Sequence, residues 1–317
     1  MFNARVILDS IGPNGARLTT FELTLPRIVL AEFNTHRMFA RNSASSRAIP
    51  VEKMLRRVLE DPFVPEYWGK NQKGMQAEQE LLKEEQECAE EEWLYARDRA
   101  VDSARSLLNI GVHKQLTNRL IEPWLWHTII FTATELDNFY ALRANKMAQP
   151  EFRTPAEMLL DVYHASKPME LEAGEWHLPL VTNYEVFLSD ATHRTWKRPN
   201  VEEDGRMRDQ VMDQDEWKYW AKVSVSRCAR ISYLTHEGKR DLSEDIAKHD
   251  ELLTNGHMSP FEHPAMALTR TQWQALARSM ANEWIERRIP TGNFWGWHQY
   301  RKTLRNEHDF SKIGAAT

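Results

Sequence analysis

The stretch EFNTHRMFARNSASSR, residues 32–47, crowds hydrogen-bond donors together directly after an apolar segment. It contains three arginines, three serines and one histidine, and it lacks glycine. Arginine presents a planar fork of donors that matches a phosphate group, and serine hydroxyls add short donors beside it. The stretch is therefore a candidate site for an anionic ligand. The alternative interpretation is that Arg37 and Arg41 are surface charges and that the serines cap the next helix.

The segments around this stretch predict its place in the fold. Alternating apolar residues predict strands at residues 5–11 and 17–25, around the turn GPNG. Pro26 suits the first turn of a helix that we expect to end near Arg41. Further along the chain, helical spacing of apolar residues predicts one long helix over residues 76–110.

Signals for helix starts continue after residue 110. Thr132 with Glu135, and Thr154 with Glu157, have the spacing of capping boxes, which predict a helix start at each threonine. Another helix is expected near residues 243–255. Strands near the start followed by several helices predict the α+β class, with a mixed or antiparallel sheet and long helices.

A boundary in the chain is predicted near residue 205. The surrounding stretch VEEDGRMRDQVMDQDE, residues 201–216, is rich in charge and poor in apolar residues, as linkers are. We therefore expect two parts, residues 1–205 and residues 206–317.

The composition excludes several classes of protein. A formal net charge of −5 argues against a general nucleic-acid binder, although a local arginine cluster can still hold an anion. Two cysteines without a CxxC pair predict neither a disulfide framework nor a thiolate zinc site. The chain has no apolar run of membrane-spanning length and no signal-peptide pattern, so we expect a soluble, cytoplasmic protein. The glycine-rich nucleotide motifs, GxSxG and HExxH are all missing from the sequence.

The stretch NGHMSPFEH, residues 255–263, gathers two histidines and a carboxylate. These residue types invite a metal site, but His257 and His263 are six residues apart with a proline between them, which fits no common zinc pattern. We therefore expect no metal here. The groups are interpreted as hydrogen-bonding partners, either within the fold or toward a polar ligand.

Taken together, these stretches resemble the motifs of the flavin-dependent thymidylate synthases. The central signature of that family is matched at His36, Arg37, Asn42, Ser45 and Arg47. Four further family elements resemble NRLIEP (118–123), LDNFYALRANKMAQPEFR (136–153), CARISY (228–233) and NGHMSPFEH. The resemblance covers roughly residues 17–50, 113–157 and 226–264.

The order of these elements differs from that of the family. The elements CARISY and SPFEH come before the His-Arg signature in the family and after it here, so the motif order is circularly permuted. Permutation is tolerated when chain ends lie close together at the surface. We therefore expect the two ends to meet, and SPFEH to pack beside residues 27–47. Residues 1–205 would bind nucleotide and flavin, and residues 206–317 would complete the same flavin site.

The resemblance implies an activity and a set of site residues. Members transfer a one-carbon unit from methylenetetrahydrofolate to C5 of dUMP, giving dTMP, with FAD as cofactor and NADPH as reductant. Arg143, facing the uracil, and His257, on the folate side, are the implied catalytic residues. FAD contacts are implied for His36, Arg37, Asn138, Ser232, Ser259 and Glu262. Contacts to the pyrimidine nucleotide are implied for Glu32, Ser45, Ser46, Arg47, Arg119 and Arg143.

Departures from the family pattern keep other hypotheses open. Thr132 and Thr134 stand where the family has asparagine and arginine, which bears on the flavin contacts. One alternative is a related C5 hydroxymethylase or methylase of dUMP, UMP or dCMP. Another is a catalytically inactive nucleotide-binding homologue. The family also implies a homo-oligomer, a tetramer whose active sites form between subunits.

The C-terminal stretch TGNFWGWHQYRKTLRN, residues 291–306, lies outside the resemblance. One interpretation is an aromatic segment that packs on the core. The other is that Trp295, Trp297 or Tyr300 forms a stacking wall for flavin or folate, because flat rings suit aromatic side chains.

Overall fold

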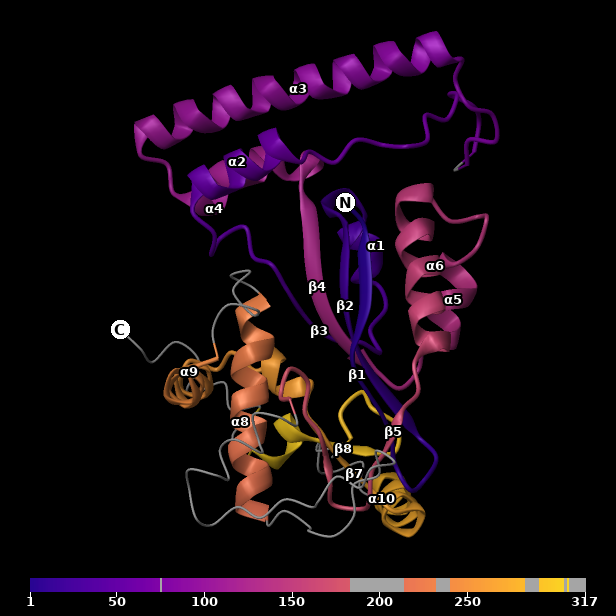
Figure 1. Cartoon of the computed structure of the whole chain (residues 1–317), viewed down its shortest axis with the longest axis vertical. Helices are drawn as coiled ribbons and strands as arrows, with labels where there is room; N and C mark the ends of the chain where they lie inside the picture. Colours follow the sequence, from indigo (N-terminus) through magenta and orange to yellow (C-terminus); the bar gives the residue numbers. More distant parts are fainter. Residues whose placement is uncertain (75, 183–213, 232–239, 283–290, 305–306, 308–317) are drawn as a thin grey trace, which may run out of the picture.

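A central sheet organises the chain. The structure, a computed structural model, describes residues 1–74, 76–182, 214–231, 240–282, 291–304 and 307. The sheet has the strand order β3-β4-β2-β1-β5 (Figure 1). Its strands are β1 (Asn3–Ile11), β2 (Arg17–Pro26), β3 (Ala40–Ser43), β4 (Trp126–Ala133) and β5 (Met169–Glu170). The pair of β5 with β1 is parallel, and the other pairs are antiparallel. The predicted α+β class and mixed sheet are confirmed.

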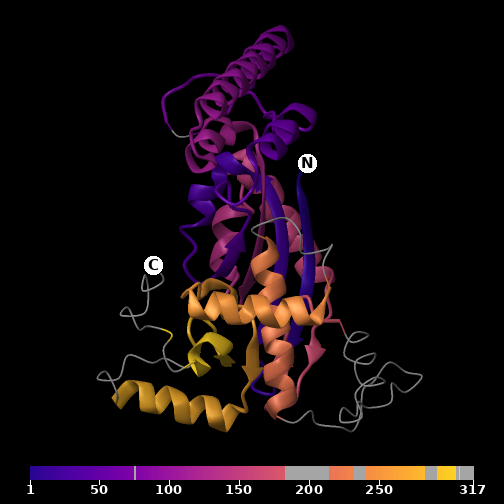
Figure 2. The same ribbon diagram turned by 90° about the vertical axis from the view of Figure 1, so that its left-hand side faces the viewer.

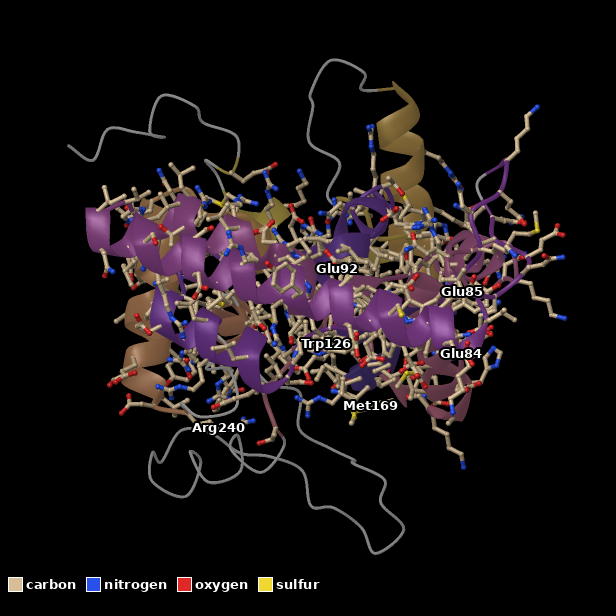
Figure 3. All side chains as sticks on the ribbon, turned by 90° about the horizontal axis from the view of Figure 1, so that it is seen from above. Glu84, Glu85, Glu92, Trp126, Met169 and Arg240 are labelled. Carbon is tan, nitrogen blue, oxygen red and sulfur yellow. The ribbon has the colours of Figure 1, made fainter. Side chains whose placement is uncertain are left out.

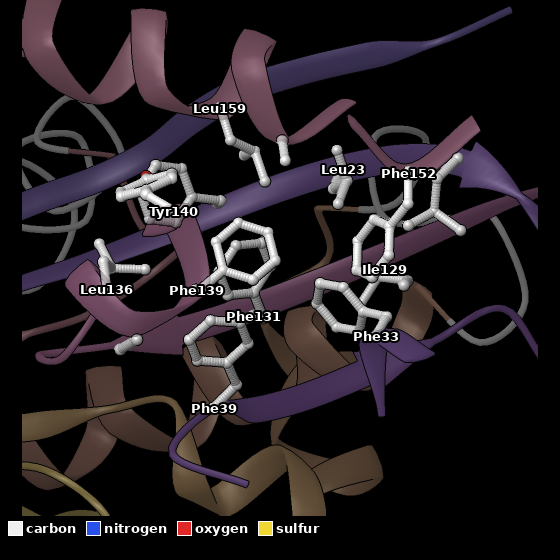
Figure 4. Packing of buried hydrophobic residues seen from close by; sticks show 14 of the residues in the cluster. Leu23, Phe33, Phe39, Ile129, Phe131, Leu136, Phe139, Tyr140, Phe152 and Leu159 are labelled. Carbon is white, nitrogen blue, oxygen red and sulfur yellow. The ribbon is translucent and has the colours of Figure 1, made fainter. Parts of the chain in front are cut away.

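The predicted hairpin of β1 and β2 is also confirmed, and Gly15 in its turn adopts the positive φ of 83° that glycine tolerates. One face of the sheet carries the main aromatic core (Figure 4). Phe21 of β2 lies opposite Phe131 of β4, and their rings stack at 5.0 Å. Helices α5 (Asp137–Arg143) and α6 (Pro150–Ala165) cover this face with Phe139, Phe152 and Leu159.

Four predicted helix boundaries are wrong, each for a physical reason, and the fourth is the start of α3 described below. The helix expected from Pro26 to Arg41 is reduced to η1 (Arg27–Val29) and α1 (Leu30–Phe33). Residues 40–43 instead pair with the distant strand β4, which satisfies their backbone groups in a sheet.

The two capping boxes are not helix starts. Thr132 lies in β4, where its hydroxyl is 2.7 Å from that of Thr20, and helix α5 begins only at Asp137. Thr154 lies inside α6, which begins four residues earlier at Pro150. Proline at the first helical position sets this start because its missing N–H costs nothing there.

A helical layer lies at one end of the long axis (Figures 1 and 2). Its elements are α2 (Val51–Glu60), α3 (Lys83–Ile110), α4 (Lys114–Thr117) and η2 (Asn118–Trp124). Helix α3 is shorter than predicted because the Glu85 carboxylate accepts from the Leu82 amide and caps its start. Gly111 ends it in the left-handed conformation at φ 91°. The view from above shows Glu84, Glu85 and Glu92 along α3, and these side chains are exposed (Figure 3).

The other end of the molecule holds a smaller sheet and, within the described ranges, five helical elements. The sheet has the order β6-β7-β8, from β6 (Trp176–His177), β7 (Ala265–Ala267) and β8 (Trp297–Gln299). Around it lie α8 (Gln214–Arg230), α9 (Leu242–Thr254), η4 (Ser259–Glu262), α10 (Arg270–Asn282) and η5 (Tyr300–Thr303). The helix expected at 243–255 is confirmed as α9. The boundary expected near residue 205 lies outside the described residues.

The packing expected from the permuted motif order is confirmed. Element η4, which carries SPFEH, contacts β3, and a His263 ring nitrogen lies 3.2 Å from the Asn42 side chain. The last residues of the chain lie outside the described part, so the meeting of the two ends stays a prediction. Among the described helices, none is long and apolar enough to cross a membrane.

Candidate functional site

A cleft of about 480 Å³ opens where the His-Arg signature meets the C-terminal segment. The turn before β3 and β3 itself contribute Arg37, Phe39 and Arg41 to it. Element η4 contributes Ser259 and Glu262. The C-terminal segment completes the lining with Gly292, Asn293, Gln299, Arg301 and Lys302. Four cationic side chains and one carboxylate therefore line the cleft, which suits an anionic ligand.

Contacts from the C-terminal segment fix the shape of this cleft. The Arg301 guanidinium donates to the Glu262 carboxylate, and its Nε donates to Glu307 at 2.8 Å. The Gln299 side chain donates to the Glu262 carbonyl at 3.0 Å. Asn293 donates to the Met38 carbonyl at 3.0 Å, which ties the segment to the turn before β3. Glu262 is thus held from both its carboxylate and its backbone.

His36 and Arg143 meet beside the cleft. The Arg143 Nε donates to His36 Nε2 at 3.1 Å, and its guanidinium lies 4.7 Å from the centre of the Phe152 ring. Burial is the main cause that lowers the pKa of His36 to about 4, and the charges of Arg143 and Arg41 lower it further. His36 is therefore neutral at pH 7 and accepts from Arg143, which fixes the arginine by a hydrogen bond and an aromatic face.

The residues Ser45, Ser46, Arg47 and Arg119, which the resemblance assigns to the nucleotide, lie at the other end of β3. The backbone pairing of β3 with β4 extends to Ala44, so residues 40–44 separate the two groups by roughly 13 Å at 3.3 Å per residue. The buried Asn118 donates to the Ser46 carbonyl at 2.6 Å. Arg47 is exposed, and Arg119 pairs with Glu122 at 3.1 Å. Within the described part of one protomer, no hydrogen bond or ion pair joins Arg143 to these residues.

The remaining predicted residues are placed as follows. Asn138 is exposed in the first turn of α5, the helix that ends at Arg143. His257 is exposed just before η4. Glu32 is half-buried, and its Oε2 has no hydrogen-bond partner among the described residues. Ser45 is half-buried in the loop after β3, and Ser232 lies outside the described residues.

Sequence reasoning missed several residues of the cleft. Arg41 is not a free surface charge, because it donates to the carbonyls of Asn34, His36 and Phe39. Arg301 and Lys302 lie in the segment that the family motifs do not cover. The one signal for them was a basic pair directly after an aromatic run, which also fits an ordinary surface.

The aromatic tail and the histidines of SPFEH have mainly structural contacts. Trp297 is fully buried in a core cluster, and Tyr300 is buried in another, so neither forms an exposed stacking wall. Trp295 is 43% exposed and lies edge-to-face with Trp273. The two ring nitrogens of the buried His263 lie within hydrogen-bond distance of Thr132 and Asn42. Within the described part of the chain, no group of three potential ligands is arranged to hold a metal.

The contact between His36 and Arg143 predicts a measurable titration. Because the pKa of His36 falls from 6.5 to about 4 on folding, the unfolded chain binds more protons between these values. The contribution of His36 to the free energy of unfolding is therefore complete above pH 6.5, falls as the pH drops, and levels off below about 4.

This titration can be followed by NMR of the imidazole. In the Arg143→Met variant we expect the pKa of His36 to rise, because one positive charge is gone, but to stay below 6.5 because burial remains. A pKa of His36 that does not change in this variant would contradict the contact.

Comparison with known proteins finds a similarity to one family. The sequence model of the thymidylate synthase complementing protein family matches residues 17–169. No curated protein sequence matches the chain. Similar solved structures include those of the UMP/dUMP methylase PolB from Streptomyces cacaoi, one bound with 5-Br dUMP and one with 5-Br UMP.

The two likenesses are weak. The first has 11% identity and a TM-score of 0.44, and covers 52% of this chain and 91% of that chain. The second has 13% identity and a TM-score of 0.43, and covers 52% and 89%. A likeness at this level transfers neither fold nor substrate. Residues 17–169 are therefore similar to the thymidylate synthase complementing protein family, and this similarity supports a methyltransferase-like enzyme of the flavin-dependent thymidylate synthase group.

Proposed function

We propose that the chain transfers a one-carbon unit from methylenetetrahydrofolate to C5 of dUMP, giving dTMP, with bound FAD and with NADPH as reductant. The observation that carries this proposal is the meeting of Arg37, Ser259 and Glu262 at one cleft, next to the pair of His36 and Arg143. These residues come from three distant segments, and each is one that the family resemblance assigns to flavin or uracil.

The residues of the cleft fit FAD. Its size lies in the range of ordinary ligand pockets, and its cations can hold the pyrophosphate as bidentate and single donors. Arg37 is exposed to the cleft and makes no ion pair with another described residue, so it is available to a phosphate. The Glu262 carboxylate accepts from ligand hydroxyl or N–H groups. When bound, FAD would supply the hydride chemistry that these side chains lack.

Arg143 and Glu32 suit the pyrimidine side of the site. A fixed arginine stabilises negative charge that builds on the uracil oxygens and N3 while C5 attacks the carbon unit. Arg143 is fixed by His36 and Phe152 before any ligand binds. The unpartnered Oε2 of Glu32 can accept from a base N–H or a ribose hydroxyl. In the net reaction the uracil loses its C5 proton to water and gains the carbon unit and a hydride that derives from NADPH.

The phosphate end of the nucleotide is assigned to Ser45, Ser46, Arg47 and Arg119. Because β3 separates them from Arg143 within one protomer, we propose that a second copy of the chain completes the site. The proposed assembly is therefore a homo-oligomer in which Arg143 and Arg47 of one site come from different copies.

The test begins with the visible absorption spectrum of the purified protein. We expect it to take up FAD, and the flavin band to bleach with NADPH faster when dUMP is present. With methylenetetrahydrofolate the product from dUMP should have the mass of dTMP, and parallel incubations with UMP and dCMP give the substrate preference. A product heavier by one oxygen would identify the hydroxymethylase instead, and nucleotide binding without NADPH oxidation would identify the inactive homologue.

The Arg37→Ala variant tests whether the flavin binds in the cleft. It should bind FAD more weakly without loss of folded-state stability, since it removes a phosphate donor and no ion pair among the described residues. Arg99→Ala, on the exposed side of α3, is the matched control and should bind FAD as the natural chain does. Equal FAD affinity in both variants would place the flavin elsewhere.

A further inference from the structure

A chain of buried polar side chains crosses the sheet and ends at the cleft. It begins at Ser10 of β1, whose hydroxyl lies 2.9 Å from Nδ1 of His177. The other ring nitrogen of His177 lies 2.8 Å from the Thr20 hydroxyl, which lies 2.7 Å from the Thr132 hydroxyl. Thr132 in turn lies 2.9 Å from Nδ1 of His263. All five side chains are fully buried.

We call this series of hydrogen-bonded side chains, from Ser10 to Asn42, the relay. Its last contact reaches the lining of the cleft. Nε2 of His263 lies 3.2 Å from the Asn42 side chain, the only partly exposed member of the relay. In the amide orientation that satisfies both ends of Asn42, its nitrogen donates to His263 Nε2 and to the Ser259 carbonyl, each at 3.2 Å. The relay therefore ends on the turn that carries Ser259 and Glu262 into the cleft.

All hydrogen bonds of the relay can form at once if each side chain donates to the next one in the same direction. Burial lowers the pKa of His177 and of His263 to about 3, so both rings are neutral at pH 7 and offer one donor and one acceptor each. If Asn42 donates to Nε2 of His263, then Nδ1 of His263 donates to Thr132, and the direction continues through Thr20 to His177 and Ser10. Loss of one hydroxyl interrupts this order and leaves buried partners unpaired.

Strands β2 and β4 contain a second pair of facing threonines, which is not part of the relay. Thr24 and Thr128 lie opposite each other on β2 and β4, with their hydroxyls 3.0 Å apart. They lie on the same face of the sheet as Thr20 and Thr132, because their positions differ by four residues along each strand. A cross-strand threonine pair is therefore not unusual in this sheet. What distinguishes Thr132 is its contact with His263.

We propose that Thr132 is a positioning residue of the cleft: through His263 and Asn42 it fixes the 259–263 turn, and with it the Ser259 and Glu262 contacts to the ligand. This inference rests on the proposed function for the identity of that ligand, FAD. It gives a role to a position at which the chain departs from the family pattern. Thr132 does not touch the ligand itself, because it is fully buried beneath the turn.

The first experiment measures FAD affinity by quenching of flavin fluorescence. Thr132→Val should raise the dissociation constant about tenfold, the usual scale for a lost buried hydrogen bond. Thr132→Ser keeps the hydroxyl and should restore the affinity, and the control Thr128→Val should change it less than about twofold. Equal effects of Thr132→Val and Thr128→Val would overturn the proposal.

A double-mutant cycle separates positioning from general loss of stability. Asn42→Ala breaks the relay at its last link and leaves the contact of Thr132 with His263 in place. If Thr132 acts through Asn42, the double variant should bind FAD no more weakly than Asn42→Ala alone. Losses that simply add would show that the two residues act independently, which would also overturn the proposal.

Amide hydrogen exchange tests the turn without any ligand. We expect residues 257–263 to exchange faster in Thr132→Val and in Asn42→Ala, and as in the natural chain in Thr128→Val. A chain that takes up no FAD but shows this pattern would refute the proposed function and keep the positioning role. Unchanged exchange in Asn42→Ala would refute the positioning role even if Thr132→Val did not fold.

Discussion

Replacing Arg143 by alanine is expected to lower the turnover of dUMP by a factor on the order of 10²–10³, the usual effect of removing one donor that stabilises charge in a transition state. The structure gives Arg143 the required rigidity. It donates to the neutral His36 at 3.1 Å and lies over the Phe152 ring, so no side-chain ordering remains for the reaction step. The measurement is kcat and KM for dUMP with saturating FAD, folate and NADPH.

The pattern of the kinetic effects identifies the role of Arg143. A loss mainly in kcat indicates charge stabilisation during reaction, whereas a loss mainly in KM indicates ground-state binding. Arg105→Ala is the control, because Arg105 pairs with Asp102 on the surface of α3, far from the cleft. Turnover in Arg143→Ala equal to that of the control would remove Arg143 from the proposed mechanism.

The same variant tests whether two copies share a site. Arg47→Ala should also be inactive, because it removes a proposed phosphate donor at the opposite end of β3. When the two inactive variants are mixed and allowed to exchange subunits, part of the activity should return, since a mixed pair contains one site with both arginines. A mixture that stays inactive under proven exchange would mean that each protomer builds its site alone.

The local parts of the fold followed from the sequence. The hairpin of β1 and β2 was predictable because alternating apolar residues flank a turn with glycine at a positive φ. The strand β3 was not, because ARNS has no strand pattern of its own and owes its conformation to pairing with β4. Thr132 shows the same limit: its local spacing to Glu135 suggested a cap, but its hydroxyl serves the sheet and His263.

The candidate site also has a part that could be predicted from the sequence and a part that could not. The sequence predicted that SPFEH would lie beside the His-Arg signature, because both resemble parts of one family site in permuted order. It could not predict that Arg301 holds Glu262 or that Asn293 holds the turn before β3. Those contacts join residues that are distant in the chain and belong to a segment without family motifs. The residue types at the site could be taken from the sequence, but the partner that each side chain contacts from a distant segment could not.

The second large effect concerns stability: replacing Asp245 by alanine should lower the free energy of unfolding by about 3–5 kcal/mol. Asp245 is fully buried in the first turn of α9, where it pairs with Arg227 at 3.0 Å and with Arg230 at 2.7 Å, both on α8. Without the carboxylate, two largely desolvated guanidinium charges remain between these helices, and like charges at this depth repel strongly. Urea unfolding monitored by circular dichroism gives the change in free energy.

The same two helices supply an exposed pair as the control. Lys222 of α8 lies 3.2 Å from Asp250 of α9, and both side chains reach solvent. Lys222→Ala, which leaves the contact of Asp250 with His249 in place, should cost at most about 1 kcal/mol, because water screens an exposed pair. Replacing the buried triad together, with methionine for Arg227 and Arg230 and leucine for Asp245, should recover most of the loss, since the cost arises from breaking a buried ion pair on one side rather than from lost volume. Equal losses for Asp245→Ala and Lys222→Ala would show that the buried carboxylate does not hold α8 to α9.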